Sequence, residues 1–349
     1  MHAALSCIAA LRRQAGNKKT SIGRRPYAAT AADAVLAPGQ AADGARRTDG
    51  DGTKRRQNGT RTEKGREDMI TIGIDVGGSA TKIVAFDREG RLKDPLFVRA
   101  TDPVTSIYGA LGRFTAENGV GLADIDQIMV TGAGAAFVKD ELYGRPCRHV
   151  SEFESLGRGG LYLSKLDEAI VVSMGTGTAL VYAKKDGTCE YLGGTGVGGG
   201  TLIGLSGELL GMDNPEHLSA LAAEGDLSRV DLRVSDLTGK KDQFGLPMNM
   251  TAANFGKVSD IATRSDKALG LFNMVFETVG MLAVFAARSK GIKDIVLTGR
   301  LSTLKPAEQV FSGLNAMFGV NFTIPVYSQF GTVIGAALTG APRREGDGK

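Results

Sequence analysis

Residues 70–86 read ITIGIDVGGSATKIVAF, two β-branched apolar runs on either side of a small polar turn. This pattern predicts a β-hairpin. The adjacent glycines Gly77 and Gly78 let the backbone turn tightly and leave its N–H groups open to an anion. Asp75, at the end of the first strand, can hold a hydrated Mg²⁺, and Lys82 can reach a terminal phosphate. The stretch therefore indicates a binding site for the phosphates of a nucleotide triphosphate.

The basic charge of the chain lies in its N-terminal segment. Residues 1–68 hold 14 of the 42 Lys and Arg but 7 of the 38 Asp and Glu, a net +7, while the remaining chain carries −3. Because this segment has no sustained hydrophobic period, we expect it to be disordered. A nucleic-acid-binding arm or a transit peptide would fit its composition. We favour Met69 as the natural start, because Lys64–Asp68 would be encoded by purine-rich codons, like an in-frame bacterial ribosome-binding site.

The remaining composition argues against several classes of protein. No run of about 18 apolar residues occurs, so we expect no membrane-spanning helix and no membrane partner. The three cysteines, Cys7, Cys147 and Cys189, are scattered and indicate a reducing compartment without a disulfide framework. No Cys/His spacing matches a metal site. Residues 1–68 contain no helix-turn-helix pattern, so we do not expect a DNA-binding regulator.

The body of the chain is long enough for two lobes. We place them at residues 69–167 and 168–340, with a disordered tail at 341–349. The second lobe opens with an apolar strand at 168–174, a Gly/Thr turn and a strand at 179–184, which is a hairpin similar in design to the first. Each lobe is therefore expected to present a glycine turn.

A third glycine-rich stretch runs from Gly193 to Gly200 and precedes an apolar helix predicted at 202–210. Consecutive glycines before a helix present free N–H groups at its positive end, which predicts an anion site. A flexible linker is the alternative, although linkers do not usually lie between a strand and an apolar helix.

Further elements follow from hydrophobic spacing and caps. Helices are predicted at 104–117, 155–163, 215–223, 266–290, 306–318 and 332–338, one more opens at 251–257, and strands are predicted at 92–99, 125–130, 188–192, 294–297 and 322–326. The apolar face of 266–290 is either core or a dimer seam. Gly132-Ala-Gly134 is only a partial dinucleotide fingerprint, so we assign no Rossmann site. Glu152 follows Ser151, the predicted helix cap, and a lone acid at this position usually only compensates the helix dipole. Its place among the other motifs of the chain makes it a candidate general base.

Taken in order, these motifs resemble the acetate/sugar kinase and actin superfamily, and more closely the type II (eukaryotic-like) pantothenate kinases. The resembling residues are Gly73–Lys82, Glu152-Phe-Glu with Gly159, Met174–Thr178, Gly198–Thr201 with Gly204, Thr251–Gly256 and Thr298-Gly299. The resemblance implies an α/β fold of the two-lobed, actin-like ATPase (ribonuclease H-like) kind, with a phosphate-binding hairpin in each lobe. It also implies phosphorylation of the primary hydroxyl of pantothenate by ATP and Mg²⁺, the first step of coenzyme A biosynthesis.

The resemblance further implies a set of site residues. Glu152 would be the general base, and Asp75 would lie near Mg²⁺. The residues implied to hold ATP are Asp75, Gly77, Gly78, Ser79, Ala80, Thr81, Lys82, Thr176, Gly198, Gly199, Gly200, Thr201, Gly299 and Arg300. Members of the family are cytoplasmic homodimers that use a long helix at the interface, here 266–290, and many are inhibited by coenzyme A or its thioesters.

The acceptor pocket implied by the resemblance contains Thr178, Ala179 and Tyr191, and two of these depart from the family pattern. Ser usually stands at the position of Ala179, and Arg, which pairs with the pantothenate carboxylate, at that of Tyr191. Loss of a charge-assisted partner costs about 1.5–3 kcal/mol. A kinase of the same fold that acts on another small alcohol is therefore an alternative, and so is an ATPase switch without an acceptor.

Overall fold

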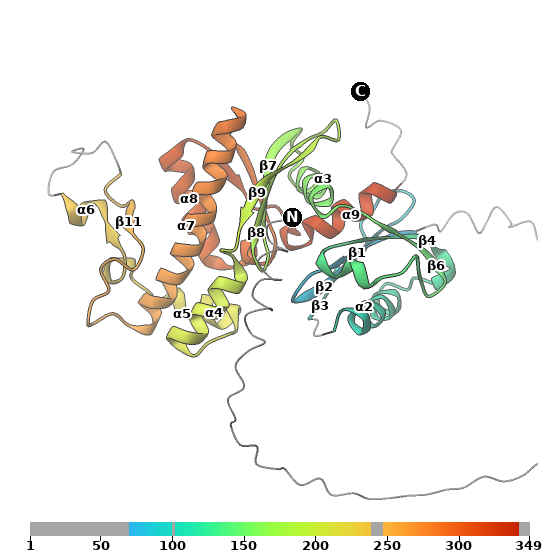
Figure 1. The fold of residues 1–349 in the computed structure, drawn as a ribbon, viewed down its shortest axis with the longest axis horizontal. Helices are drawn as coiled ribbons and strands as arrows, with labels where there is room; N and C mark the ends of the chain where they lie inside the picture. The colour runs from blue at the N-terminus through green and yellow to red at the C-terminus, as the bar shows by residue number, and fades with distance from the viewer. Residues whose placement is uncertain (1–69, 100–101, 239–246, 342–349) are drawn as a thin grey trace, which may run out of the picture. The chain divides into compact units, whose positions relative to one another are not determined.

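A computed structural model describes residues 70–99, 102–238 and 247–341 (Figure 1). The predictions for the basic N-terminal extension, for Met69 and for the tail at 342–349 lie outside the described residues. The helices are α2 (Pro103–Glu117), α3 (Glu152–Ser164), α4 (Gly199–Leu210), α5 (Pro215–Ala222), α6 (Val234–Leu237), α7 (Arg264–Lys290), α8 (Lys305–Phe318) and α9 (Gly331–Gly340). The short 3₁₀ helices are η3 (Leu122–Asp124), η4 (Ala133–Phe137), η5 (Leu227–Arg229), η6 (Arg300–Thr303) and η7 (Ser328–Phe330).

A six-stranded mixed sheet forms from the first half of the described chain. Its order is β3-β2-β1-β4-β6-β5, with β1 (Ile70–Val76), β2 (Ala80–Phe86), β3 (Leu96–Arg99), β4 (Ile125–Thr131), β5 (Glu141–Leu142) and β6 (Arg145–His149). The predicted first hairpin is confirmed, because β1 and β2 pair antiparallel, and β4 runs parallel to β1. Helix α2 buries Ile107, Leu111 and Phe114 against one face, in a core shared with the β1 side chains Ile72 and Ile74.

A five-stranded sheet forms from the second half. Its order is β13-β12-β7-β8-β9, with β7 (Glu168–Met174), β8 (Thr178–Lys184), β9 (Cys189–Thr195), β12 (Asp294–Thr298) and β13 (Asn321–Thr323). The predicted second hairpin is confirmed by the antiparallel pairing of β7 and β8, and β12 runs parallel to β7. Strand β13 is shorter than the predicted 322–326, since Pro325 has no N–H to donate to the ladder.

Helices α3 and α9 lie side by side and connect the two sheets (Figure 1). Helix α9 packs on β1, β2 and β4, whereas α3 packs on α9 and on β7, β8 and β9. Glycines permit the close crossing, because a Cβ on Gly159 would lie 1.8 Å from the carbonyl oxygen of Gly331. A Cβ on Gly335 would likewise lie 1.7 Å from the carbonyl oxygen of Ser155. Helix α9 therefore covers the first sheet, even though it is the last of the described helices.

The predicted helix at 251–257 is wrong. Thr251–Ala253 forms strand β11, which pairs with β10 (Leu232–Arg233) in a small two-stranded sheet. Phe255 follows with a φ of 55°, a left-handed conformation that a helix interior does not accept. Its N–H donates to the Asp231 carboxylate at 2.8 Å, so a side chain takes the backbone bond that a helix would have used.

The longest helix, α7, is part of the core of the second half. Thr263 caps its N-terminus, with the Asp266 N–H donating to the Thr263 hydroxyl, and the helix buries Phe272 and Phe276 beside α8. Among the described residues it is the one helix long and apolar enough to cross a membrane, with a mean hydropathy of 1.7 in its best window. Because 61% of that window is buried inside the fold, its burial is that of a core helix.

Candidate active site

The turn of the first hairpin presents backbone and charge at the end of β1. Gly77 donates its N–H to the Ala80 carbonyl at 2.9 Å, and this bond closes the turn with Gly78 and Ser79 exposed at its tip. Asp75 and Lys82 are cross-strand partners, and Lys82 Nζ lies 3.3 Å from Asp75 Oδ2. The side chain of Asp75 is only 10% exposed, so this ion pair is largely enclosed. The predicted cation and carboxylate therefore act on one another at the turn.

Two residues predicted at the ATP phosphates do not offer their side chains there. Thr81 is fully buried, pairs with Val76 in the hairpin, and lies on the face of the sheet opposite to Asp75. Ala80 is also buried, at 7% exposure. Any phosphate contact from either residue would have to come from its backbone.

The turn of the second hairpin lies close to the first. Gly175 donates its N–H to the Gly177 carbonyl at 2.9 Å, and Thr176 is exposed between them. A Cβ on Gly78 would lie 3.9 Å from Thr176 Oγ1. The structure thus brings together the glycine turns that the sequence predicts for the two lobes.

The glycine run before α4 has a different local role from the one predicted. Helix α4 begins at Gly199, within the run, and the N–H groups of Gly199 and Gly200 donate to the carbonyls of Gly175 and Thr176 at 2.8 Å. The sequence predicted that these two N–H groups are free to bind an anion. In the structure they are not free, because both are bonded to carbonyls of the second turn. A Cβ on Gly199 would lie 2.8 Å from the Gly175 carbonyl oxygen. Because glycine has no side chain, the start of α4 can approach the second turn closely enough to bond to it. The hydroxyl of Thr201 donates to the Gly196 carbonyl and accepts the Gly198 N–H.

Glu152 stands at the first position of α3, which Ser151 caps by accepting the N–H of Glu154. The residue is exposed by surface area, yet protein atoms crowd its carboxyl group, and this desolvation raises its pKa. The negative charge of Asp75 raises that pKa further, and the positive charge of Lys82 opposes the shift. The predicted base is therefore in electrostatic contact with the charged pair of the first hairpin.

Of the residues predicted to contact the acceptor, Tyr191 packs against α3, the helix that Glu152 begins. The ring of Tyr191 stacks on that of Phe153, with centroids 4.0 Å apart and planes 18° from parallel, and Phe153 follows Glu152 in α3. Tyr191 is 48% exposed, and Ala179 is partly buried. The hydroxyl of Thr178 is buried and donates to the Val197 carbonyl at 2.8 Å. Tyr191 thus offers an aromatic wall where the resemblance implies a guanidinium.

The predicted adenosine contacts follow β12. Gly299 has a φ of 87° and packs so tightly that a Cβ would lie 2.4 Å from the Met174 carbonyl oxygen. Arg300 pairs with Glu216 of α5 and lies over the ring of Phe97 in β3, 5.2 Å from the centroid. This arginine is already held by both an acid and an aromatic ring.

The sequence analysis missed the role of Thr131 and Gly132 at the end of β4. Thr131 is the parallel partner of Asp75, and a Cβ on Gly132 would lie 2.5 Å from Asp75 Oδ1. The short η4 follows. The Thr-Gly pair after a strand, repeated at Thr298-Gly299, is the signal that could have drawn attention to this position.

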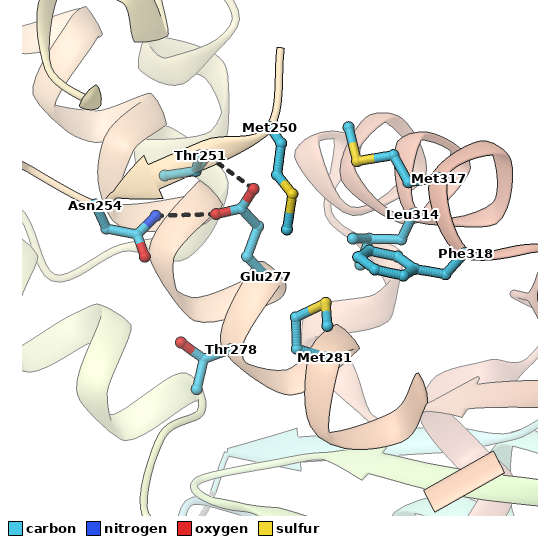
Figure 2. A pocket seen from close by; sticks show the side chains of 9 residues that line it. All are labelled: Met250, Thr251, Asn254, Glu277, Thr278, Met281, Leu314, Met317 and Phe318. Atoms are coloured by element: carbon cyan, nitrogen blue, oxygen red, sulfur yellow. Dashed lines mark hydrogen bonds between the residues drawn. The ribbon is translucent and has the colours of Figure 1, made fainter. Parts of the chain in front are cut away.

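The motif at Thr251–Gly256 lies at a separate cavity of about 220 Å³ (Figure 2). Figure 2 shows the carboxylate of Glu277 facing Thr251 and Asn254, which donate to its two oxygens at 2.8 and 3.0 Å. Burial raises the pKa of Glu277, and the bonds from Asn254 and Thr251 oppose the shift. The cavity is lined by Met250, Thr251, Asn254, Glu277, Thr278, Met281, Leu314, Met317 and Phe318, none of which belongs to the predicted site. The motif therefore fixes the β11 turn to α7.

Comparison with solved structures shows the fold. The activator of the 2-hydroxyisocaproyl-CoA dehydratase from Clostridium difficile with bound ADPNP matches with a TM-score of 0.56 at 16% identity, over 78% of this chain and 94% of that one. Together with the two sheets described above, this match identifies the two-lobed actin-like ATPase fold, and the predicted fold class is confirmed.

Comparison with known sequences shows the family. A model of the family described as Fumble matches residues 168–316. The type II pantothenate kinase of Bacillus cereus is 30% identical over 277 residues, 76% of this chain and 96% of that protein. The type II pantothenate kinase of Oceanobacillus iheyensis is 30% identical over 283 residues, 78% of this chain and all of that protein. On these matches, the chain belongs to the type II pantothenate kinase family.

Proposed function

We propose that the protein is an ATP-dependent kinase that phosphorylates the primary hydroxyl of pantothenate to 4′-phosphopantothenate, the first step of coenzyme A biosynthesis. The observation that carries the proposal is the carboxylate of Glu152 within electrostatic range of the Asp75–Lys82 pair, at facing glycine turns. Phosphoryl transfer depends on positioning and charge neutralisation, and this arrangement provides groups for both.

ATP is assigned to the space between the two turns. Backbone N–H groups at Gly78 and Ser79, with the exposed hydroxyl of Thr176, contact its phosphates, and Lys82 neutralises their charge. Gly299 and Arg300 are assigned to the adenosine, and Gly198–Thr201 support the second turn. The halves 69–167 and 168–340 are assigned as the two lobes, with α9 of the second half packed on the sheet of the first and α3 of the first half packed on the sheet of the second.

Mg²⁺ is assigned to Asp75. No group of three or more His, Cys, Asp or Glu side chains able to hold a metal occurs among residues 70–99, 102–238 and 247–341. Mg²⁺ suits such a place, because it binds through one or two carboxylates, waters and the substrate phosphates. When bound, it neutralises charge on the phosphates.

Glu152 is assigned as the general base. Its carboxylate accepts the proton of the acceptor hydroxyl as that oxygen attacks the terminal phosphorus of ATP, and the bond from this phosphorus to the bridging oxygen breaks to release ADP. Because desolvation and Asp75 raise its pKa, the carboxylate is a stronger base than an ordinary surface glutamate.

Substitution of the base tests this function in the full chain. Glu152→Gln should lower turnover with pantothenate about 10²–10⁴-fold and leave ATP binding intact. Glu154→Gln is the matched control, because Glu154 lies two residues further along α3 and its carboxylate pairs with Arg158 at 2.9 Å. Undiminished transfer by Glu152→Gln would refute the assigned base.

A second acceptor is favoured by the Phe153–Tyr191 stack. An aromatic ring on α3, the helix of Glu152, suits an alcohol without a carboxylate at the position of Tyr191. Assay of pantothenate against neutral amide alcohols of the same length distinguishes the two candidates. Tyr191→Arg should shift the preference toward pantothenate by about ten-fold if a missing cation limits its binding.

We also propose a cytoplasmic homodimer that coenzyme A thioesters inhibit. Leu282 and Phe285 expose apolar surface on α7, at 37% and 57%, which supports an interface along this helix. Phe285→Glu should convert a dimer to a monomer in light scattering of the full chain. An unchanged mass, or a wild-type monomer, would refute this interface.

A further inference from the structure

A buried hydroxyl beside Asp75 has no hydrogen-bond partner. Thr131 is fully buried, and its Oγ1 is one of three buried side-chain oxygens without a partner among the described residues. Buried polar groups are nearly always bonded, because an unsatisfied one costs about 1–3 kcal/mol. A hydroxyl kept at this position therefore calls for an explanation.

The geometry places Thr131 on the same side of the sheet as Asp75. The two residues are partners in the parallel ladder of β1 and β4, and paired residues direct their side chains to one face. Asp75 Oδ1 lies directly against Gly132, the residue after Thr131, as the 2.5 Å approach of a Cβ there indicates. The other oxygen, Oδ2, contacts Lys82. The carboxylate thus lies between the lysine and the end of β4.

The second half of the molecule shows how such a threonine is satisfied. Thr298 ends β12 as Thr131 ends β4, and both precede a glycine of positive φ. Thr298 is buried as well, but its hydroxyl donates to the Val172 carbonyl at 3.0 Å. Its ladder partner is Ser173, which has no charge. Of these two threonines, the one without a partner is therefore the one whose ladder partner is a carboxylate.

We propose that Thr131 is a positioning residue for Asp75, whose hydroxyl becomes the hydrogen-bond donor to this carboxylate when Lys82 turns to the ATP phosphates. The inference rests on the proposed function, because phosphate binding is what draws Lys82 away. Without a second donor, Asp75 would keep Lys82 or lose its orientation. Thr131 thus fixes the orientation of this nearly buried carboxylate when the lysine leaves, while the Mg²⁺ assigned to Asp75 would offset its charge.

Thr131→Val tests this role, because valine has the same shape and no hydroxyl. The melting temperature of the ligand-free full chain should rise by about 2–4 °C, since an unsatisfied buried group is removed. Calorimetric binding of a non-hydrolysable ATP analogue in excess Mg²⁺ should weaken about ten-fold, and Thr131→Ser should restore it. Thr298→Val is the matched control and should do the reverse, with a lower melting temperature and unchanged nucleotide affinity.

Three results would overturn the inference. The first is Thr131→Val binding the Mg²⁺–nucleotide complex as tightly as the wild type, and the second is failure of Thr131→Ser to restore the affinity. The third is equal weakening of binding by Thr298→Val and Thr131→Val, which would indicate a general effect of packing. If the wild-type chain itself does not bind the complex, the proposed function fails, and this inference fails with it.

Discussion

The two hairpins share one backbone plan and differ in chemistry. In each, the first strand pairs antiparallel with the second and parallel with a later strand that ends in Thr-Gly. The position of Asp75 in the first corresponds to Ser173 in the second, because these are the partners of Thr131 and Thr298. Lys82 faces Asp75, whereas an alanine faces Ser173. At the turn end, charge is therefore confined to the first hairpin, because the ion pair of the second, Glu168–Lys184, lies at the opposite end of its strands.

The second hairpin satisfies its polar groups internally. Thr178 donates to the Val197 carbonyl, Thr298 donates to the Val172 carbonyl, and the N–H groups that begin α4 bond to the second turn. The first hairpin instead has an ion pair at its turn, and two buried hydroxyls, Thr81 in β2 and Thr131 in the neighbouring β4, have no partner. The difference shows that the same backbone arrangement can form a structural support or a charged binding turn, and that a few side chains decide which of the two it forms.

The largest effect is expected when Asp75 of the first hairpin is replaced by serine, the residue at the corresponding position, Ser173, of the second hairpin. Asp75→Ser should lower kcat/KM on the order of 10²–10³-fold, because the carboxylate assigned to Mg²⁺ and its pair with Lys82 are lost. Steady-state kinetics of the full chain measures the loss, with Ser173→Ala as the matched control that keeps most activity. Equal losses in the two variants would break the comparison.

Alanine at Gly132 and Gly299, the positive-φ glycines that follow Thr131 and Thr298, should distinguish a structural role from a role in catalysis. Gly132→Ala and Gly299→Ala should each lower the free energy of unfolding by about 1–3 kcal/mol, because φ values of 91° and 87° strain an alanine. Gly132→Ala should also slow turnover, since its Cβ meets Asp75 Oδ1, whereas at Gly299 the Cβ meets backbone. Denaturant unfolding and kinetics measure the two effects. A Gly132→Ala variant that is less stable but fully active would contradict this assignment.

The acid limb of the pH profile should report the charges of the first hairpin. Glu152 must be ionised to act as a base, and its pKa is raised above 4.5. As the pH is lowered, activity should therefore be lost at a higher pH than it would be with an ordinary glutamate as the base. Lys82→Met removes the charge that opposes the shift and should move this limb to still higher pH. Rates measured across pH test the direction. A limb that moves to lower pH in Lys82→Met would be incompatible with the assigned base.

The smallest effect is expected at the start of the second hairpin's return strand. Thr178→Val removes the bond to the Val197 carbonyl and should lower the free energy of unfolding by about 1 kcal/mol. Its acceptor KM should stay near the wild-type value if the hydroxyl is structural. A large rise in that KM would return Thr178 to the substrate contacts predicted from the sequence.

Local patterns predicted much of this fold. Alternation around glycine turns located both hairpins, and the cap Ser151 located the start of α3, since these depend on nearby residues. The turn at Phe255 was missed, because its N–H bonds to Asp231, 24 residues away. Proximity of Thr131 to Asp75 depends on pairing of β4 with β1, which hydrophobic periodicity does not specify. Sequence thus identified candidate site residues, and long-range pairing decided which of them meet.

The crossing of α3 and α9 constrains how the gene can vary. Any single-base change that replaces a glycine adds at least a Cβ, and at Gly159 and Gly335 that atom would lie within 1.8 Å of a backbone oxygen. Neither oxygen can move without shifting a helix, and α3 begins with Glu152. Replacements at these two codons should therefore be purged from natural populations as strictly as changes in the site itself, although both residues are remote from the chemistry.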